Sequence, residues 1–264
     1  MIIDIGANVG EFILDCAKAY PSGKFIAVEP IRENIAIIAN LKSQRNLEDL
    51  IILEGVVSDK SEIVDFNVSL SGDKGVSSVL DFNPDLARNE YWSTRDDLNF
   101  SHSLKVQSKP MSEWLEGFGD EDIEFVKIDC QGLDLIALKS FGPDWIKRIN
   151  AGMLECAGSD LDFLYSDETC DMTHALATLA SFGFKVYKIL PNDLGYAEYN
   201  IYFYREIDQF LGIMDKFLLA SNPVFLGGMD ASHIMAQYEN SYSWKVTKPL
   251  RTLKRLISKR LSKL

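Results

Sequence analysis

A glycine-containing segment near the start of the chain has the spacing of a nucleoside-binding loop. Residues 4–10 are DIGANVG, in which Gly6 permits a tight turn after an apolar segment and Gly10 permits close packing of a following helix. Glu29 follows 19 residues after Gly10, at the end of the next apolar segment. An acidic residue at this position of an α/β protein accepts hydrogen bonds from the ribose hydroxyls of a nucleoside. These features together predict a nucleoside-containing cofactor.

Two classes of cofactor fit this loop, and its other residues discriminate between them. A dinucleotide places its pyrophosphate against bare backbone, and its usual motif has glycine where this chain has Asn8. The carboxylate of Asp4 would also repel a pyrophosphate. S-adenosylmethionine instead carries an ammonium and a sulfonium, which an acidic residue favours. We therefore expect S-adenosylmethionine; a nicotinamide dinucleotide, or a plain strand-to-helix turn without a ligand, are the alternatives.

Three side chains are candidates for the chemistry of methyl transfer. The reaction is an in-line displacement that needs an acceptor atom held close to the methyl group. A base helps when the acceptor is a hydroxyl, because a hydroxyl is a poor nucleophile until it loses its proton. Asp129 and Glu155 each follow an apolar segment, and His102 lies in a polar one. Each has a simpler interpretation: Asp129 as a cofactor ligand, Glu155 as a cap and His102 as an exposed loop residue.

Metal chemistry is not indicated by the sequence. His174 and His233 do not belong to a recognisable metal-ligand motif, and Asp129 with Glu155 alone would not define a metal site. The chain also has no serine flanked by glycines in a nucleophile elbow, no Cys-x-x-Cys pair and no P-loop lysine. We predict no metal cofactor.

The elements that must position these residues alternate along the chain. Alternation of short β-rich segments with helical patterns predicts a three-layer, doubly wound α/β fold with a mostly parallel sheet. The last two strands have only a loop between them, so we expect an antiparallel strand at one edge. Strands are expected at 2–5, 25–28, 50–57, 62–68, 125–128, 151–154, 184–189 and 199–204, and helices at 11–20, 31–43, 133–141 and 173–182.

The order and spacing of these motifs resemble the FkbM-type methyltransferases. The resemblance rests on IDIGANVG at residues 3–10, VEP at 28–30, VSD at 57–59 and VKIDCQG at 126–132, and it extends over about residues 2–205. It implies a class I, Rossmann-like S-adenosylmethionine-dependent enzyme with a seven-stranded sheet. It also implies methyl transfer to oxygen, often on sugars of polysaccharides or of glycosylated natural products.

The resemblance also implies roles for individual residues. Asp59 would contact the adenine amino group, and Asp129 would lie at the methionine end of the cofactor. The family usually has Glu where this chain has Gln131 and Asp134, and it commonly has a helix before the first strand. The predicted cofactor-binding residues are Asp4, Gly6, Ala7, Asn8, Gly10, Glu29, Ser58, Asp59 and Asp129.

Charge is distributed unevenly along the 264 residues. The net charge of −12 combines −20 on residues 1–244 with eight basic and no acidic residues in 245–264. The acidic part would repel a phosphate backbone, so we expect no nucleic-acid partner. We predict a methyltransferase domain at 1–205, with a lid or insertion at 70–110. A helical appendage at 206–244 and a basic amphipathic C-terminal helix at 245–264 would follow.

The C-terminal segment has the pattern of a membrane-surface helix. Apolar residues recur every three or four positions from Leu250 to Leu264, and basic residues fill the remaining arc. Such a helix binds anionic lipid, so we expect residues 249–264 to contact an anionic membrane surface; packing on the acidic body is the alternative. Residues 243–251 resemble a C-terminal motif of bacterial glycosyltransferases and methyltransferases of surface-polysaccharide assembly, which suggests a glycosyltransferase partner.

The cellular location follows from cysteine usage and hydropathy. The four cysteines show no paired spacing, the N-terminus has no signal-peptide pattern, and no apolar run approaches the roughly 20 residues that span a bilayer. We expect a cytoplasmic protein, peripheral on the inner face of the membrane.

Our hypothesis is an O-methyltransferase for a sugar hydroxyl of a carbohydrate or glycolipid acceptor in bacterial surface polysaccharide or glycoconjugate biosynthesis. Phe82, Tyr91, Trp92 and Phe100 could stack on a sugar, or could form a small satellite core under the 70–110 segment. An NAD(P)-dependent oxidoreductase is one alternative function. A catalytically silent, membrane-tethered scaffold of a glycan-assembly complex is another.

Overall fold

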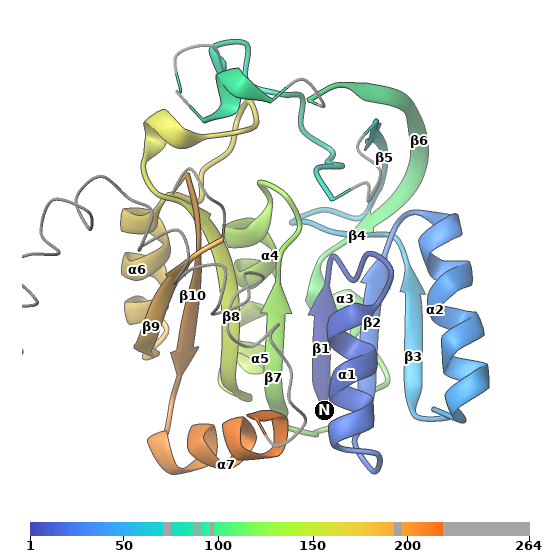
Figure 1. Cartoon of the computed structure of the whole chain (residues 1–264). Coiled ribbons are helices and arrows are strands. Elements are labelled where there is room, and N and C mark those ends of the chain that lie inside the picture. Colours follow the sequence, from blue (N-terminus) through green and yellow to red (C-terminus); the bar gives the residue numbers. More distant parts are fainter. Residues whose placement is uncertain (71–74, 87–88, 90, 96–97, 193–196, 219–264) are drawn as a thin grey trace, which may run out of the picture. The chain divides into compact units, whose positions relative to one another are not determined.

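The computed structural model describes residues 1–70, 75–86, 89, 91–95, 98–192 and 197–218. The chain divides into two units, Met1–Asn222 and Pro223–Leu264, and the second lies outside the described residues. The first unit contains a seven-stranded sheet of order β3-β2-β1-β7-β8-β10-β9 (Figure 1). Its strands are β1 (Ile2–Ile5), β2 (Phe25–Glu29), β3 (Leu50–Glu54), β7 (Ile123–Ile128), β8 (Ile149–Ala157), β9 (Lys185–Pro191) and β10 (Glu198–Tyr204).

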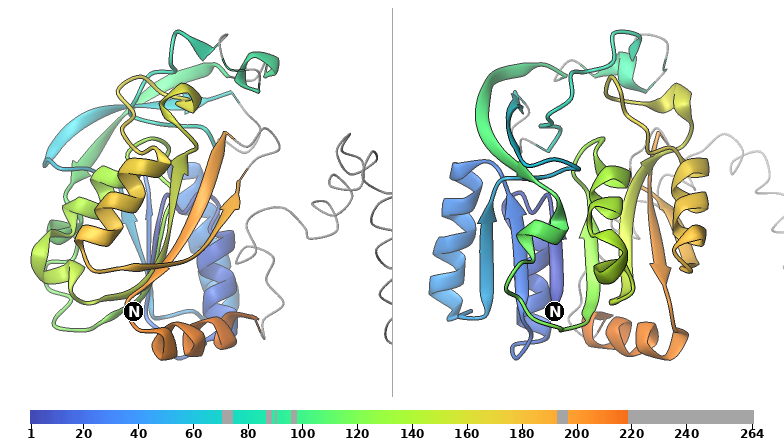
Figure 2. Two further views of the ribbon diagram at one scale, coloured as in Figure 1. Left: turned by 90° about the vertical axis from the view of Figure 1, so that its left-hand side faces the viewer. Right: turned by 180° about the vertical axis from the view of Figure 1, so that it is seen from behind.

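Helices cover both faces of this sheet. Figure 2 shows α1 and α2 on one face and α4, α5 and α6 on the other. Strands β1 and β2 are buried along their whole length, which explains their nearly continuous apolar sequences. Every strand pair is parallel except those made by β10, which runs antiparallel between β8 and the edge strand β9. The predicted three-layer α/β fold is confirmed. The helices are α1 (Glu11–Ala19), α2 (Arg32–Arg45), α4 (Asp134–Ser140), α5 (Gly142–Ile146) and α6 (Met172–Ser181).

A glycine ends the third strand earlier than the sequence predicts. The apolar segment 50–57 was expected to form one strand, but β3 ends at Glu54 and the chain turns at Gly55, where φ is 154°. A Cβ at this position would lie 2.4 Å from the carbonyl oxygen of Gln107, so the turn requires glycine. The chain then enters β4 (Val56–Val57), which belongs to a different sheet.

This second sheet has three strands and lies above the carboxyl ends of the main sheet (Figure 1). Its order is β4-β6-β5, with β5 at Glu62–Ser69 and β6 at Phe100–Lys109. The predicted strand at 62–68 is therefore part of the second sheet. Strand β6 lies within the segment 70–110 that was expected to be a lid or insertion. In its sequence, FSHSLKVQSK, Phe100, Leu104 and Val106 alternate with polar residues, so a strand signal was present and the sequence prediction missed it.

The aromatic residues of segment 70–110 pack against one another. Trp92 is 2% exposed, and its indole nitrogen donates to the carbonyl oxygen of Asp162 at 2.8 Å. The ring of Phe82 stacks on Phe100, with ring centroids 4.1 Å apart, and also on Tyr165. These aromatic residues were expected either to stack on a sugar or to form a small satellite core. The contacts form a satellite core, and Trp92 is too buried to stack on a sugar.

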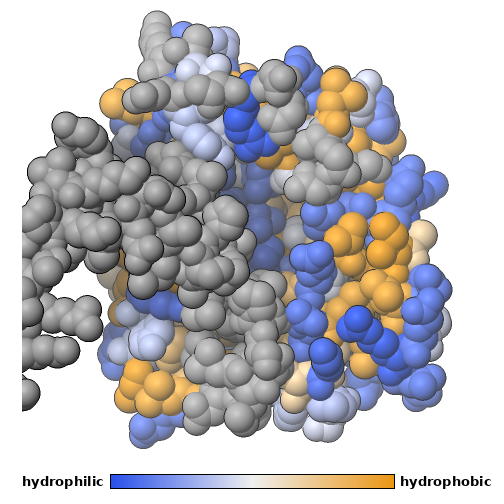
Figure 3. Space-filling view, in the orientation of Figure 1, coloured by the Kyte–Doolittle hydropathy of each residue, from blue (hydrophilic) through white to orange (hydrophobic). Residues whose placement is uncertain are grey.

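The remaining described elements are short or lie at the end of the described chain. They are α3 (Met111–Trp114), α7 (Ile207–Leu218) and the 3-10 turns Trp92–Thr94 and Asp160–Asp162. Helix α7 begins the predicted appendage at 206–244; residues 219–244 and the predicted basic helix at 245–264 lie outside the described residues. No helix in the described part of the chain is long and apolar enough to cross a membrane. Hydrophilic and hydrophobic side chains are interspersed over the described surface in Figure 3.

Candidate active site

A cavity lies at the carboxyl ends of β1, β2 and β7, where parallel α/β sheets bind their ligands. Its floor is the loop after β1, and one wall comes from the end of β2 and the start of α2. The opposite wall is the segment after β7. Residues from the second sheet and from the segment that follows β5, including Phe66, Ser77 and Val79, complete the lining. The chain that leaves the main sheet at Gly55 therefore also encloses the cavity.

The loop after β1 depends on residues that tolerate left-handed backbone. Gly6 has φ of 78°, and a Cβ on it would lie 1.9 Å from the carbonyl oxygen of Asp129. Asn8 also has positive φ, 49°, and asparagine is one of the few other residues that adopts this conformation readily. Asn8 therefore keeps the turn of a glycine-rich loop while placing an amide in the cavity lining.

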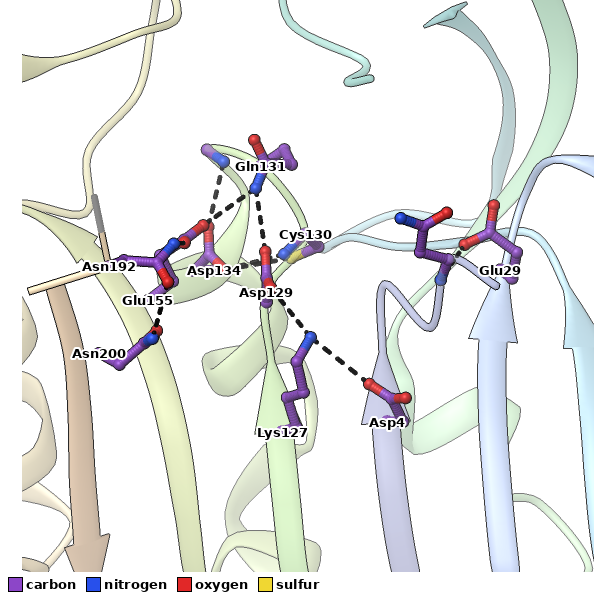
Figure 4. Close-up of polar contacts among 12 residues, drawn as sticks. Asp4, Glu29, Lys127, Asp129, Cys130, Gln131, Asp134, Glu155, Asn192 and Asn200 are labelled. Atoms are coloured by element: carbon purple, nitrogen blue, oxygen red, sulfur yellow. Dashed lines mark hydrogen bonds and ion pairs between the residues drawn. The ribbon is translucent and has the colours of Figure 1, made fainter. Parts of the chain in front are cut away.

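Glu29, labelled in Figure 4, lies at one end of the cavity, and three donors hold its carboxylate in place. Its carboxylate accepts hydrogen bonds from the backbone N–H of Asn8 at 2.8 Å and of Ile31 at 3.0 Å, and from Nδ2 of Asn34 at 3.2 Å. Burial raises the pKa of Glu29 to about 7, although these hydrogen bonds oppose the rise. The carboxylate is thus fixed in place and poised to change its protonation state near neutrality.

Asn34 is a site residue that the sequence prediction missed. Its amide also donates to Oδ1 of Asn8 at 3.0 Å, so it joins the loop after β1 to the end of β2. Asn34 is 5% exposed, whereas most of α2 is not buried. Asn34 precedes the buried Ile38 by four residues, one helical turn, so a polar residue in line with an apolar one was the available signal.

A buried lysine organises the other end of the cavity. The ammonium of Lys127 lies 2.9 Å from Oδ2 of Asp129 and 3.6 Å from Oδ1 of Asp4 (Figure 4). Burial raises the pKa of Asp4 to about 6 despite this ammonium. Burial acts against the charge of Asp129 too, but Lys127 and the amide of Gln131 lower the pKa of Asp129 below its ordinary value. Asp129 therefore presents a carboxylate to the cavity, whereas Asp4 lies beneath it and does not line it.

Glu155 lies next to Asp129 but is screened from the cavity. It is 3% exposed, and one of its oxygens accepts a hydrogen bond from Asn192. The other accepts from Nε2 of Gln131 at 3.0 Å, and the same nitrogen donates to Oδ1 of Asp129 at 2.9 Å. Burial, together with the nearby charge of Asp129, raises the pKa of Glu155 well above its ordinary value. Two neighbouring carboxyl groups thus have pKa values that are displaced in opposite directions, a pattern typical of active sites.

Several predicted site residues do not line the cavity. Because β3 ends at Glu54, the residues that follow it at the cavity are Gly55–Val57, and Asp59 is exposed and accepts a hydrogen bond from Ser58. His102 is exposed on β6, with Nδ1 2.8 Å from the hydroxyl of Ser101. Ala7 and Gly10 shape the loop after β1 from outside the lining. The structure therefore brings together Gly6, Asn8, Glu29 and Asp129, with Asp4 and Glu155 behind them.

The lining matches the chemistry of S-adenosylmethionine better than that of a dinucleotide. Carboxylates lie at both ends of the cavity: Glu29 could accept hydrogen bonds from ribose hydroxyls, and Asp129 could contact a cationic group. Apolar side chains such as Val28 and Val56 also line the cavity and could contact a flat base. No Lys, Arg or His is among the described residues that line the cavity, so a pyrophosphate would have no cationic partner there.

Comparison with known proteins gives a family match and several structural matches. The family model described as Methyltransferase FkbM domain matches residues 4–191. A precorrin-6y C5,15-methyltransferase from Geobacter metallireducens has a TM-score of 0.39 at 14% identity, covering 77% of this chain and 78% of that chain. A SAM dependent methyltransferase from Aquifex aeolicus has a TM-score of 0.37 at 11% identity, covering 78% and 81%. Aeropyrum pernix fibrillarin with natively bound S-adenosyl-L-methionine has a TM-score of 0.39 at 10% identity, covering 76% and 65%. A search of curated proteins gives no match.

Proposed function

Because the chain belongs to the FkbM methyltransferase family and is therefore an S-adenosylmethionine-dependent methyltransferase, we propose that its acceptor is a hydroxyl of a neutral sugar. The observation that carries the proposal is the charge at the end of the cavity around Asp129. This end presents a carboxylate, and no basic side chain is among the described lining residues. A phosphate or carboxylate acceptor would be repelled there, whereas a neutral hydroxyl can donate a hydrogen bond to Asp129.

Different residues of the cavity would bind the cofactor and orient the acceptor. S-adenosylmethionine supplies an electrophilic methyl group. Glu29 would accept hydrogen bonds from its ribose, and the loop of Gly6 and Asn8 would support it from below. Asp129 would orient the acceptor hydroxyl or the cationic end of the cofactor. Because Lys127 lowers the pKa of Asp129, this carboxylate suits orientation better than the removal of a proton before methyl transfer.

The proposed setting is the assembly of a bacterial surface polysaccharide or glycoconjugate at the inner face of the membrane. Residues 249–264 would bind the anionic membrane surface, because residues 245–264 carry eight basic side chains and no acidic ones. A carbohydrate or glycolipid would be the acceptor, and a glycosyltransferase would be a neighbouring partner.

The acceptor class can be tested with S-adenosylmethionine that carries an isotopically labelled methyl group. We expect label on a neutral glycan as a methyl ether, which resists mild alkali. Cells that lack the gene should have a surface glycan lighter by one methylene group for each missing methyl. Label that mild alkali releases would indicate a methyl ester on a carboxylate and would contradict the proposal.

The membrane contact can be tested separately. Deletion of residues 245–264 should abolish co-sedimentation with phosphatidylserine vesicles while leaving S-adenosylmethionine affinity unchanged. Vesicles of phosphatidylcholine alone are the control. Equal sedimentation of the full and shortened chains with phosphatidylserine would reject the membrane role.

A further inference from the structure

The side-chain amide of Gln131 lies between the two carboxylates at the reacting end of the cavity (Figure 4). Its nitrogen donates to Oδ1 of Asp129 at 2.9 Å and to Oε2 of Glu155 at 3.0 Å. Its oxygen lies 2.9 Å from the phenolic oxygen of Tyr165, which donates to it. Both N–H groups and the carbonyl of the amide are therefore engaged, and this fixes which end of the amide faces the carboxylates.

Gln131 joins Asp129 to Glu155, two side chains that also interact with each other directly. The second oxygen of Asp129 accepts from Lys127, and the second oxygen of Glu155 accepts from Asn192. Each carboxylate is thus held at both oxygens, and each shares one donor, the Gln131 amide, with the other. Gln131 lines the cavity, whereas Glu155 does not, so the amide also separates Glu155 from the acceptor.

A glutamine can donate hydrogen bonds to both Asp129 and Glu155 at any pH, and a glutamate cannot. The amide nitrogen supplies two donors and does not titrate, whereas an ionised carboxyl supplies none and a protonated one supplies a single donor. An ionised carboxyl at position 131 would also add a negative charge beside that of Asp129.

We propose that Gln131 is a positioning residue that holds the Asp129 carboxylate in place at the cavity and keeps Glu155 from reaching the acceptor. The proposal rests on the proposed function, because it takes Asp129 as the group that faces the reacting atoms. It goes beyond that function by assigning the geometry of Asp129 to an uncharged neighbour.

The consequence for pH dependence involves every ionisable group around the amide. In wild type, the bridge between Asp129 and Glu155 needs no added proton. In Gln131→Glu, one added proton supplies one of the two donors that the amide supplied, so the bridge re-forms only in part, and that proton is lost as pH rises. The ionisable groups that face the cluster are Asp4 on β1, Lys127 on β7, Asp129 and Cys130 after β7, Asp134 on α4, Glu155 on β8, Glu198 on β10, and Tyr165 and Glu168 in the loop after β8.

The test compares wild type, Gln131→Glu and the uncharged, donor-free Gln131→Met. At saturating S-adenosylmethionine, kcat of Gln131→Glu should fall about tenfold per pH unit above the apparent pKa of its added proton, while wild type stays flat in the same range. Gln131→Met should have reduced kcat at every pH, with an unchanged pH profile. A pH profile for Gln131→Glu that matches wild type, or wild-type kcat in Gln131→Met, would overturn the proposal.

A second measurement does not require methyl transfer. The urea midpoint of Gln131→Glu should fall further below that of wild type as pH rises, because the folded variant loses the proton that its bridge needs. A constant difference between the two midpoints would also overturn the proposal. Failure of wild type to methylate any hydroxyl acceptor would count against the proposed function alone, since the urea measurement still reports on the amide bridge.

Discussion

Replacement of Lys127 by methionine should destabilise the fold mainly through the fully buried carboxylate of Asp4, because the other partner of Lys127, Asp129, is partly exposed at the cavity. Asp4 has no exposed surface, and neither of its oxygens has a donor at ordinary hydrogen-bond distance within the described part of the chain, although the Ile13 backbone and Lys127 lower its pKa. The Lys127 ammonium, 3.6 Å from Oδ1, is its nearest counter-charge. Methionine retains the apolar stem of lysine but not its charge. Removal of one partner of a buried ion pair costs about 3–5 kcal/mol, so we expect Lys127→Met to lose an amount in this range near pH 8.

The loss should depend on pH, and its sign follows from the pKa of Asp4. Burial already raises this pKa from 3.8 to about 6, and removal of the ammonium raises it further. The folded variant therefore binds a proton that the unfolded chain has released above about pH 4. The penalty is full above the folded pKa of Asp4 and decreases as pH falls toward 4.

The matched control is the double variant Lys127→Met, Asp4→Asn. It removes the buried charge with its partner, and well-packed neutral replacements of a buried pair are often close to neutral in stability. Urea unfolding followed by circular dichroism at about pH 5 and pH 8 measures all three proteins. A loss below about 1 kcal/mol in Lys127→Met at pH 8, or a double variant no more stable than the single one, would refute the electrostatic explanation.

The remaining predictions concern the cofactor end of the cavity. Burial raises the pKa of Glu29 to about 7, and ribose hydroxyls bind the ionised carboxylate, so the affinity for S-adenosylmethionine should rise by up to about tenfold from pH 6 to pH 7. Titration calorimetry measures this change. The Glu29→Gln variant should bind S-adenosylmethionine weakly and without the pH dependence. Gly6→Ala should abolish cofactor binding or unfold the domain, because its Cβ would meet the Asp129 carbonyl, whereas Gly117→Ala, also at positive φ but with open space around it, should cost only about 1 kcal/mol in urea unfolding. Asn34→Ala should cost about 1–3 kcal/mol in the same assay, since it removes one of the three donors to the buried Glu29 carboxylate and the donor to Oδ1 of Asn8; no change would argue against its bridging role.

The parts of the fold that could be predicted are those with a strong local signal. Strands β1 and β2 are buried on both faces and therefore appear as short apolar runs. The loop after β1 has positive φ at Gly6 and Gly10, and the glycines at these positions mark the turn in the sequence. Glu29 was found by its spacing from that loop. Such signals involve neighbours in the sequence, so one sequence suffices to detect them.

The parts that could not be predicted depend on contacts between distant residues. The carbonyl of Gln107, far along the chain, leaves no room for a side chain at Gly55, where the chain turns out of β3, and Asp59 lies outside the cavity. Gln131 could be recognised as a departure from the family. The hydrogen bonds around it could not be predicted, because each joins residues that are far apart in the sequence. Gln131 and Glu155 are 24 positions apart, Tyr165 and Gln131 are 34, and Asn192 and Glu155 are 37.

The membrane contact stays a prediction from the sequence, because the basic residues 245–264 lie outside the described part of the chain. The same holds for the sugar acceptor and the glycosyltransferase partner. The vesicle experiment and the labelled-methyl experiment address these separately from the cofactor site.

The most direct test of the central claim is titration calorimetry of the purified chain with S-adenosylmethionine and, in parallel, with NAD. The account predicts one-to-one binding of S-adenosylmethionine, strongly weakened by Glu29→Gln, and no binding of NAD. Binding of NAD in place of S-adenosylmethionine, or no S-adenosylmethionine binding at millimolar concentration, would contradict it.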